Sequence, residues 1–272
     1  MTGAALAAHP GVGKVAFTGE TATGQAILHA AGTIKKVSLE LGGKSPNVVR
    51  GRGHRALARE SPYGVFDNAG QDCRARSRDP GPALGPRRVV ELFGEATSKV
   101  VWATRPTRRD GDGTLVTRRH MESVLARIEA GRAEGAHVVT GGGRLTGAAF
   151  DEGTYVAPTV FDRATPGMSI VREEVFGPVV AVILFGRRGR CGPPRQRLAL
   201  WAVGVGVGRA GHRSRPARLA GIRSGVISVN CNSSVHTQAP FGGMKQSGLG
   251  RELGMHALDE YTELKNVYVD LT

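Results

Sequence analysis

The sequence predicts an α/β protein with a mainly parallel sheet, because short strands alternate with helical segments along the chain. Lys14–Thr18 reads as a short strand that ends at Gly19. The helix-like run Ala22–Ala31 follows at once, and a strand, a glycine turn and a helix in that order form half of a βαβ unit. Farther along, Met121–Gly131 places apolar residues on one face, which is typical of an amphipathic helix.

Further short apolar runs predict the remaining strands. They are Lys36–Leu41, Asn47–Val49, Ala136–Thr140, Val156–Phe161, Val179–Phe185 and Val226–Val229. The last predicted strand, Lys265–Leu271, has no neighbour in the sequence, and we expect it to pair with the edge of another sheet.

Length and composition limit the class of protein. The 272 residues suffice for one large or two ordinary domains. No apolar run approaches the roughly 18 residues of a membrane span, and residues 1–10 lack the pattern of a secretory signal. Cys73, Cys191 and Cys231 lie far apart with no C-x-x-C pair, which argues against a disulfide framework or a metal site. The cysteine pattern therefore predicts a protein of the reducing cytoplasm.

The net charge of +14 is at first sight that of a nucleic-acid-binding protein. The whole excess lies in four stretches, residues 50–56, 79–88, 102–114 and 186–220, and the rest of the chain is neutral. Aromatic residues make up only 5% of the chain, and the arginines of these stretches stand among prolines and glycines. Any binding to nucleic acid would therefore be nonspecific and salt-sensitive, and this is the alternative from a different class of function.

Four short motifs contain residues with chemical potential. Phe17–Thr21 is a glycine turn that opens a helix, where free backbone N–H groups can bind a phosphate. Glu40–Pro46 sets a carboxylate beside two glycines, as a general base in a tight loop would be. Phe66–Cys73 ends at a cysteine, and Glu173–Pro178 joins two carboxylates to a phenylalanine and a glycine. Singly, each also fits an ordinary turn, a surface carboxylate, a buried cysteine or a core phenylalanine.

Taken together and in this order, the four motifs resemble the aldehyde dehydrogenase superfamily. The resemblance continues through Ile222–Asn230 and Pro240–Gly248 and covers nearly the whole chain except the four basic stretches. It implies part of a Rossmann-type cofactor domain in residues 1–42 and an α/β catalytic domain in residues 43–240. It also implies a return segment with an oligomerisation strand in residues 241–272.

The resemblance also implies a chemistry, the oxidation of an aldehyde to a carboxylic acid with NAD or NADP. Cys73 resembles the nucleophile, whose thiolate attacks the aldehyde carbon and whose backbone N–H helps to hold the oxyanion. Glu40 resembles the base that activates water to release the acid. No metal is implied.

Further positions match cofactor and substrate contacts of the family. Gly19 and Glu20 match the helix start beneath the pyrophosphate, and Leu41 matches a cofactor-binding position. Glu174 matches the residue that holds the nicotinamide ribose, and Phe176 the one that packs near the nicotinamide. Phe241 lies in the segment that lines the substrate tunnel. The implied partners are a small aldehyde and further copies of the chain, in a dimer or tetramer.

The chain departs from the family in length and in its four basic stretches. Family members are nearly twice as long, and the first strands, one oxyanion-hole asparagine and a lysine that contacts the adenosine ribose have no counterpart here. The choice between NAD and NADP depends largely on that part. The run Cys231–His236 is similar to members that act on amino- or betaine-type aldehydes, which does not fix the substrate.

The basic stretches read as coding sequence in the wrong frame. One possible coding of Leu198–Gly208, started one base later, gives Ser-Arg-Tyr-Gly-Leu-Ser-Gly-Ser-Val-Trp, which resembles the family at that place. The other three behave alike, so we interpret all four as compensated frameshifts. Because Pro80, Pro82 and Pro86 cannot sit in a central strand, the stretches are expected to replace strands and helices. The alternative to an active enzyme is then a misfolded or inactive remnant.

Overall fold

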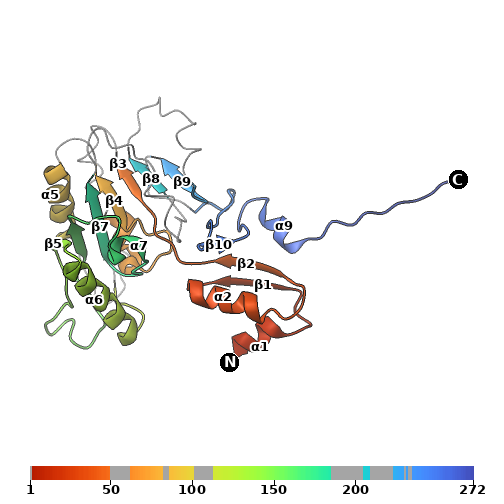
Figure 1. Ribbon diagram of the computed structural model, residues 1–272, viewed down its shortest axis with the longest axis horizontal. Helices are drawn as coiled ribbons and strands as arrows, with labels where there is room; N and C mark the ends of the chain where they lie inside the picture. Colours follow the sequence, from red (N-terminus) through yellow and green to blue (C-terminus); the bar gives the residue numbers. More distant parts are fainter. Residues whose placement is uncertain are drawn as a thin grey trace.

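The chain is described from a computed structural model. It describes residues 2–49, 62–81, 86–100, 113–184, 205–208, 223–229, 231 and 235–272. Figure 1 shows a larger α/β body beside a smaller layer that contains β1, β2, α1 and α2, with the C-terminal segment running away from both. The predicted α/β class is confirmed.

The smaller layer is a parallel strand pair connected by a helix. Its elements are α1 (Thr2–Ala8), β1 (Lys14–Thr18), α2 (Thr21–Ala30), β2 (Lys36–Glu40) and β10 (Gly248–Leu249). The parallel register of β1 and β2 runs from Lys14 opposite Lys36 to Thr18 opposite Glu40, which completes the βαβ unit that the sequence predicts in half. Strand β10 lies antiparallel on β2 with Gly248 opposite Glu40, so the C-terminal part of the chain closes this sheet.

The larger body contains two groups of strands. The first has the order β4-β7-β6-β5 and consists of β4 (Arg78–Gly81), β7 (Val179–Leu184), β6 (Thr159–Asp162) and β5 (His137–Thr140). The second is a parallel set of β3 (Asn47–Val49), β8 (Val205–Gly208) and β9 (Ile227–Val229). Only β5 runs antiparallel to its neighbour in the first group, so the prediction of a mainly parallel sheet is confirmed.

Helices cover both faces of the four-stranded sheet. They are α4 (Tyr63–Phe66), the 3₁₀ turn η1 (Asp67–Gly70), α5 (Pro86–Thr97), α6 (Arg118–Ala133) and α7 (Ser169–Arg172), and a short α9 (Ala257–Tyr261) follows β10. Along β7, Val179 and Ala181 belong to the cluster beneath α6 and α7, whereas Val180 and Val182 belong to the cluster beneath α4 and α5. Alternate side chains of a strand point to opposite faces, so β7 is apolar throughout and is buried on both sides.

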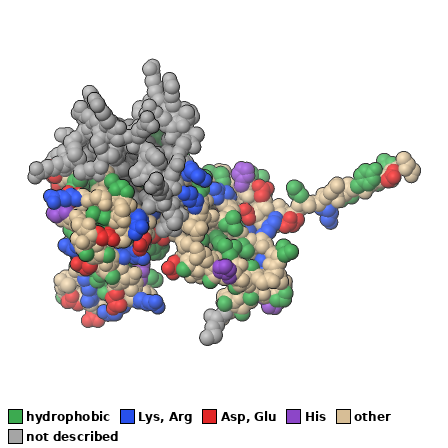
Figure 2. Space-filling view, in the orientation of Figure 1, with side chains coloured by type: hydrophobic (Ala, Val, Ile, Leu, Met, Phe, Trp, Pro, Cys, Tyr) green, Lys and Arg blue, Asp and Glu red, His purple; other side chains and the backbone are tan. Residues whose placement is uncertain are grey.

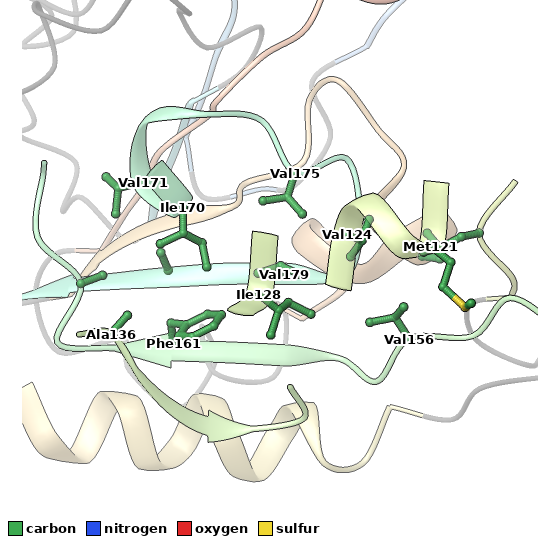
Figure 3. Close-up of a cluster of buried hydrophobic side chains, with 14 residues drawn as sticks. Met121, Val124, Ile128, Ala136, Val156, Phe161, Ile170, Val171, Val175 and Val179 are labelled. Carbon is green, nitrogen blue, oxygen red and sulfur yellow. The ribbon is translucent and has the colours of Figure 1, made fainter. Parts of the chain in front are cut away.

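Helix α6 supplies the centre of the larger cluster (Figure 3). Met121, Val124 and Ile128 are buried in the same cluster as Phe161 of β6, with Ile128 beside Phe161. The structure begins the helix three residues before the predicted Met121, because the Thr117 side chain caps it by accepting a hydrogen bond of 3.1 Å from the His120 N–H. The polar first turn hides this start from an argument based on apolar spacing.

Two prolines of the stretch at residues 79–88 overturn the expectation that it breaks regular structure. Pro80 lies in β4, which forms a ladder with β7 and lies beside β3 without a hydrogen-bonded ladder to it among the described residues, so a residue without an N–H can be placed there. Pro86 is the first residue of α5, where the missing N–H has no helical partner to lose. Strand Val205–Gly208 likewise falls within residues 186–220. Residues 50–56, 82–85, 102–112, 186–204 and 209–220 lie outside the described residues.

The predicted strand Lys265–Leu271 is not a strand in this chain. The segment is extended and exposed, and Figure 1 shows it leaving the body. A strand is defined by hydrogen bonds to a neighbour, and the chain offers none to this segment within its described residues. The pairing with another subunit stays a prediction.

Figure 2 shows basic and acidic side chains interspersed on the described part of the face in view.

The packing of α6 predicts a large cost for truncating its central side chain. Ile128→Ala is expected to lower the free energy of unfolding by about 2–5 kcal/mol, because Ile128 is fully buried. Glu122→Ala, at an exposed position of the same helix, should change it by less than about 0.5 kcal/mol. Chemical denaturation of both variants measures the difference, and equal losses would contradict the placement of α6.

Candidate active site

The first two motifs meet where β1 passes into α2. The Gly19 N–H donates to the Glu40 carbonyl over 3.0 Å, which joins the glycine turn to the end of β2. In α2, a Cβ on Gly24 would lie 2.6 Å from the Leu41 side chain, so the helix packs closely on Leu41. Leu41 is therefore buried against α2, whereas Glu20 is exposed at the N-cap and makes no side-chain cap bond.

Glu40 is a buried carboxylate at the end of β2. Only 4% of the residue is exposed, and its Oε2 has no hydrogen-bond partner among the described residues. The pKa of Glu40 is raised from 4.5 to about 7, mainly because of burial and also because of the neighbouring Glu252, while Arg251 and the Gly243 N–H oppose the shift. The group can therefore change its proton near neutral pH.

Cys73 follows a tight turn of left-handed residues. Asn68, Ala69 and Gly70 all have positive φ values, of 54°, 54° and 71°. The two that carry side chains are strained, at a cost on the order of 1–3 kcal/mol each. A Cβ on Gly70 would collide with the Gly177 carbonyl, so the cysteine loop and the loop of the fourth motif touch backbone to backbone.

The surroundings of Cys73 disfavour its thiolate. The pKa of Cys73 is raised to about 12, mainly because of burial and also because of the carboxylates of Asp72, Glu174 and Glu40, while Arg74 opposes the shift. The predicted nucleophile is therefore a neutral thiol at neutral pH in this structure. Attack on a carbonyl requires a proton acceptor, and the carboxylates that raise this pKa are the candidates.

Glu174 bridges the fourth motif to the second. Its Oε1 accepts a hydrogen bond of 3.0 Å from the Gly43 N–H, and its Oε2 lies where a Cβ on residue 42 would stand, so a larger residue at position 42 would displace this carboxylate. Burial raises the pKa of Glu174 to about 7, which the Gly43 N–H, Lys44 and Arg127 oppose. This carboxylate lies close to Cys73 and to the glycine pair at once.

Helix α6 holds the Glu174 loop at two points. Arg127 pairs with Glu173 at 2.6 Å, and the His120 Nε2 lies 2.7 Å from the Phe176 carbonyl oxygen. The His120 and Phe176 rings also meet edge to face, with their centroids 6.0 Å apart. Phe176 has a φ of 52° and is 39% exposed, so its ring is held at the surface on a strained backbone.

The structure thus brings Cys73, Glu40 and Glu174 together from three distant segments. Phe241 is half-buried and pairs with Glu252 through two backbone hydrogen bonds, next to the Gly242 that contacts Glu40. In the described part of the chain, no three His, Cys, Asp or Glu side chains are grouped so that they could hold a metal ion. None of the described helices is both long and apolar enough to cross a membrane.

Sequence reasoning missed several residues around the site. They are Lys44, Asp72, Arg74, Arg76, His120 and Arg127. A signal existed for His120 and Arg127, because residues seven apart share one face of a helix. The pairing of Asp72 with Arg74 spans only two residues and has no equivalent signal.

Comparison with known proteins identifies the family. The model of the aldehyde dehydrogenase family matches residues 1–188 and 213–267. The chain belongs to the aldehyde dehydrogenase family. The resemblance stated from the motifs is confirmed, and the match leaves out residues 189–212, which lie inside the basic stretch at residues 186–220.

Individual relatives of this aldehyde dehydrogenase family member are longer. The mitochondrial aldehyde dehydrogenase of Rattus norvegicus is 38% identical over 98% of this chain and 51% of its own length. The NAD+ complex of aldehyde dehydrogenase from Bacillus cereus is 37% identical with a TM-score of 0.91, over 99% of this chain and 54% of that one. A mutant indole-3-acetaldehyde dehydrogenase of P. syringae, in complex with NAD+ and IAA, is 33% identical with a TM-score of 0.93. The match covers 100% of this chain and 55% of that one. The chain spans about half the length of the relatives it matches.

The raised pKa of Glu40 predicts a pH-dependent stability. The folded carboxyl binds its proton up to about pH 7, whereas the unfolded one releases it near 4.5, so this contribution to stability declines as the pH rises between these values. Glu40→Gln should therefore stabilise the chain by about 1–3 kcal/mol at about pH 8 and much less at about pH 5. Thermal unfolding at both pH values measures this.

The control for this effect is Glu152→Gln, at an exposed position. It should change the unfolding temperature equally little at both pH values. A gain for Glu40→Gln of the same size at both pH values would show that its pKa is not raised in the folded chain.

Proposed function

We propose that the protein oxidises an aldehyde to a carboxylic acid, with NAD or NADP as the hydride acceptor and a covalent intermediate on Cys73. The observation that carries the proposal is the cluster of Cys73, Glu40 and Glu174, which lie within electrostatic reach of one another in a member of this family. Perturbed carboxylates around a partly buried thiol are the signature of a site that transfers protons and forms a covalent bond.

The binding region fits a dinucleotide in three respects. The N-terminus of the ten-residue α2 has no side-chain cap, which leaves its backbone N–H groups to a phosphate. The glycine at position 42 leaves room for Glu174 beside it, and the carboxylate can accept a hydrogen bond from a ribose hydroxyl. When bound, an oxidised nicotinamide supplies a hydride acceptor and a positive charge near the thiol.

The residues of the chain would divide the reaction as follows. The Cys73 thiol loses its proton to a neighbouring carboxylate, and the sulfur forms a bond to the aldehyde carbon, which leaves a negative charge on the oxygen. After the carbon gives up its hydride, the Cys73 thioester remains. Glu40 takes a proton from water, the hydroxide adds to the thioester carbon, and the carbon–sulfur bond breaks to give the acid and the free thiol.

The C-terminal segment is proposed to join copies of the chain in a dimer or tetramer. Leu264, Val267, Tyr268 and Leu271 are exposed apolar residues on a segment that projects from the body. An extended chain with unpaired backbone groups can add a strand to a sheet edge of another copy.

Turnover assays of the full chain test the proposed reaction. Formation of NADH or NADPH with a panel of aldehydes is expected, and Cys73→Ala should abolish it. Glu40→Gln should lower turnover by about 10²–10⁴-fold while the Cys73 thioester accumulates and becomes detectable by mass spectrometry. Cys191→Ala, which removes a cysteine outside the four motifs, should leave turnover unchanged. Absence of both turnover and acylated Cys73 with every aldehyde would support an inactive remnant instead.

The ion pair between α6 and the Glu174 loop predicts a change in cofactor binding. Arg127→Ala should raise the KM for the cofactor about two- to fivefold with a smaller effect on kcat, since an exposed pair contributes about 0.2–1 kcal/mol. Arg127→Lys should restore part of the loss, and Glu173→Gln should cause a similar loss that is not additive with Arg127→Ala. Equal effects on kcat and KM, or full additivity, would exclude a positioning role through Glu173.

A further inference from the structure

The residues on both sides of Cys73 line a pocket of about 290 Å³. Its walls come from Asp72, Arg74, Ala75 and Arg76 and from α4, which contributes Tyr63 and Val65. The volume is at the lower end of the range for small-molecule sites, so the pocket suits a short-chain compound. Its place next to Cys73 makes it a candidate for the part of the substrate that does not react.

The ion pair in this pocket leaves cationic donors available. Arg74 donates hydrogen bonds to both carboxylate oxygens of Asp72. The backbone N–H of Arg74 donates to Oδ1 over 2.9 Å, and the Nε of Arg74 donates to Oδ2 over 2.7 Å. The pair uses only the Nε of the guanidinium. No hydrogen bond reaches the two terminal nitrogens of Arg74 from any residue that the structure describes. This fork of donors matches the geometry of a carboxylate.

A second guanidinium strengthens the positive field. Arg76 is 4% exposed and also lines the pocket, where its Nη2 donates to the Cys231 carbonyl over 2.9 Å. Burial lowers the pKa of Arg76, and Arg74 lowers it further, so the two cations lie close enough to repel each other. An anion beside them would relieve that repulsion. The other acid of the lining, Asp67, is exposed to solvent, which screens its charge.

We propose that this pocket binds the carboxylate of a short ω-oxo acid, an aldehyde with an anionic group at its far end, and that Arg74 selects it. The inference rests on the proposed function, because it names the substrate class of the same site. The terminal nitrogens of Arg74 would bind the carboxylate, and Tyr63, Val65 and Ala75 would contact the methylene groups. The aldehyde carbon would then reach Cys73 next to this pocket.

Alkylation of Cys73 tests the pocket without turnover. Iodoacetate and iodoacetamide are of similar size and form the same carbon–sulfur bond with loss of iodide, but only iodoacetate carries a carboxylate. Mass spectrometry of the Cys73 peptide gives the ratio of the two rates, and N-acetylcysteine gives the ratio for an unguided thiol. Relative to that reference, the intact chain should favour iodoacetate about three- to tenfold more than Arg74→Gln does, and Arg74→Lys should keep most of the preference.

Two further variants separate binding from general charge. Arg74→Gln also leaves Asp72 without its cation, so the double variant Asp72→Asn with Arg74→Gln restores the net charge of the pair without the guanidinium. It should still lack the preference, whereas Arg118→Gln, at an exposed position on α6, should keep it. Equal ratios in the intact chain and in Arg74→Gln, or recovery of the preference in the double variant, would overturn the proposal.

A turnover comparison distinguishes this proposal from the proposed function. With an active enzyme, kcat/KM for 4-oxobutanoate should exceed kcat/KM for butanal. Arg74→Gln should reduce the ratio of these two values by about the same factor as it reduces the ratio of the alkylation rates. If neither of these two aldehydes nor any other aldehyde of the panel is oxidised, the proposed function fails, while the alkylation ratio still decides the pocket. Oxidation of butanal in preference to 4-oxobutanoate would contradict the assignment of the substrate class.

Discussion

The contact between the Gly70 backbone and the Gly177 carbonyl holds the site together. It fixes the loop that ends at Cys73 against the loop that carries Glu174, and a Cβ at residue 70 would force the two apart. A second close approach, at Gly42, lets the Glu174 carboxylate lie on the Glu40 loop. Glycine is required at residue 70 because a Cβ would meet backbone atoms, whereas a Cβ at residue 42 would displace the end of the Glu174 side chain.

This packing has an electrostatic consequence. Once the loops meet, the thiol of Cys73 shares a partly buried space with Glu40, Glu174 and Asp72, and burial raises the pKa of the thiol and of the first two carboxylates. Such an arrangement costs folding free energy, because each group is held in the less solvated state. Proteins accept that cost at sites where protons must move near neutral pH.

Much of the fold follows from local sequence. Lys14–Thr18 and Asn47–Val49 form the predicted strands residue for residue, since their patterns and flanking turns agree. The effect of Pro80 depends on which neighbouring strand its position would have to bond to, which only the tertiary structure shows. Residues 265–271 form no strand here for a related reason: a strand needs a partner, and the described chain supplies none.

The candidate site, like the fold, contains features that the sequence predicts and features that depend on tertiary structure. Cys73, Glu40 and Glu174 lie in motifs that can be recognised in the sequence, whereas the surroundings of the thiol cannot. The direction of its pKa depends on which carboxylates burial brings near, and the free donors of Arg74 depend on how Asp72 folds back on it. Sequence patterns identify reactive groups, and packing determines their protonation.

The pH dependence of Cys73 alkylation by iodoacetamide tests the account most directly, because the central claim is that neighbouring carboxylates and burial keep this thiol protonated. The rate should rise with pH without levelling off near the pKa of about 8.5 of an ordinary thiol, since the pKa of Cys73 is raised to about 12. Addition of NAD+ should move the curve to lower pH, because a positive charge nearby favours the thiolate. A curve that levels off near that ordinary pKa and does not respond to NAD+ would contradict the proposed cluster.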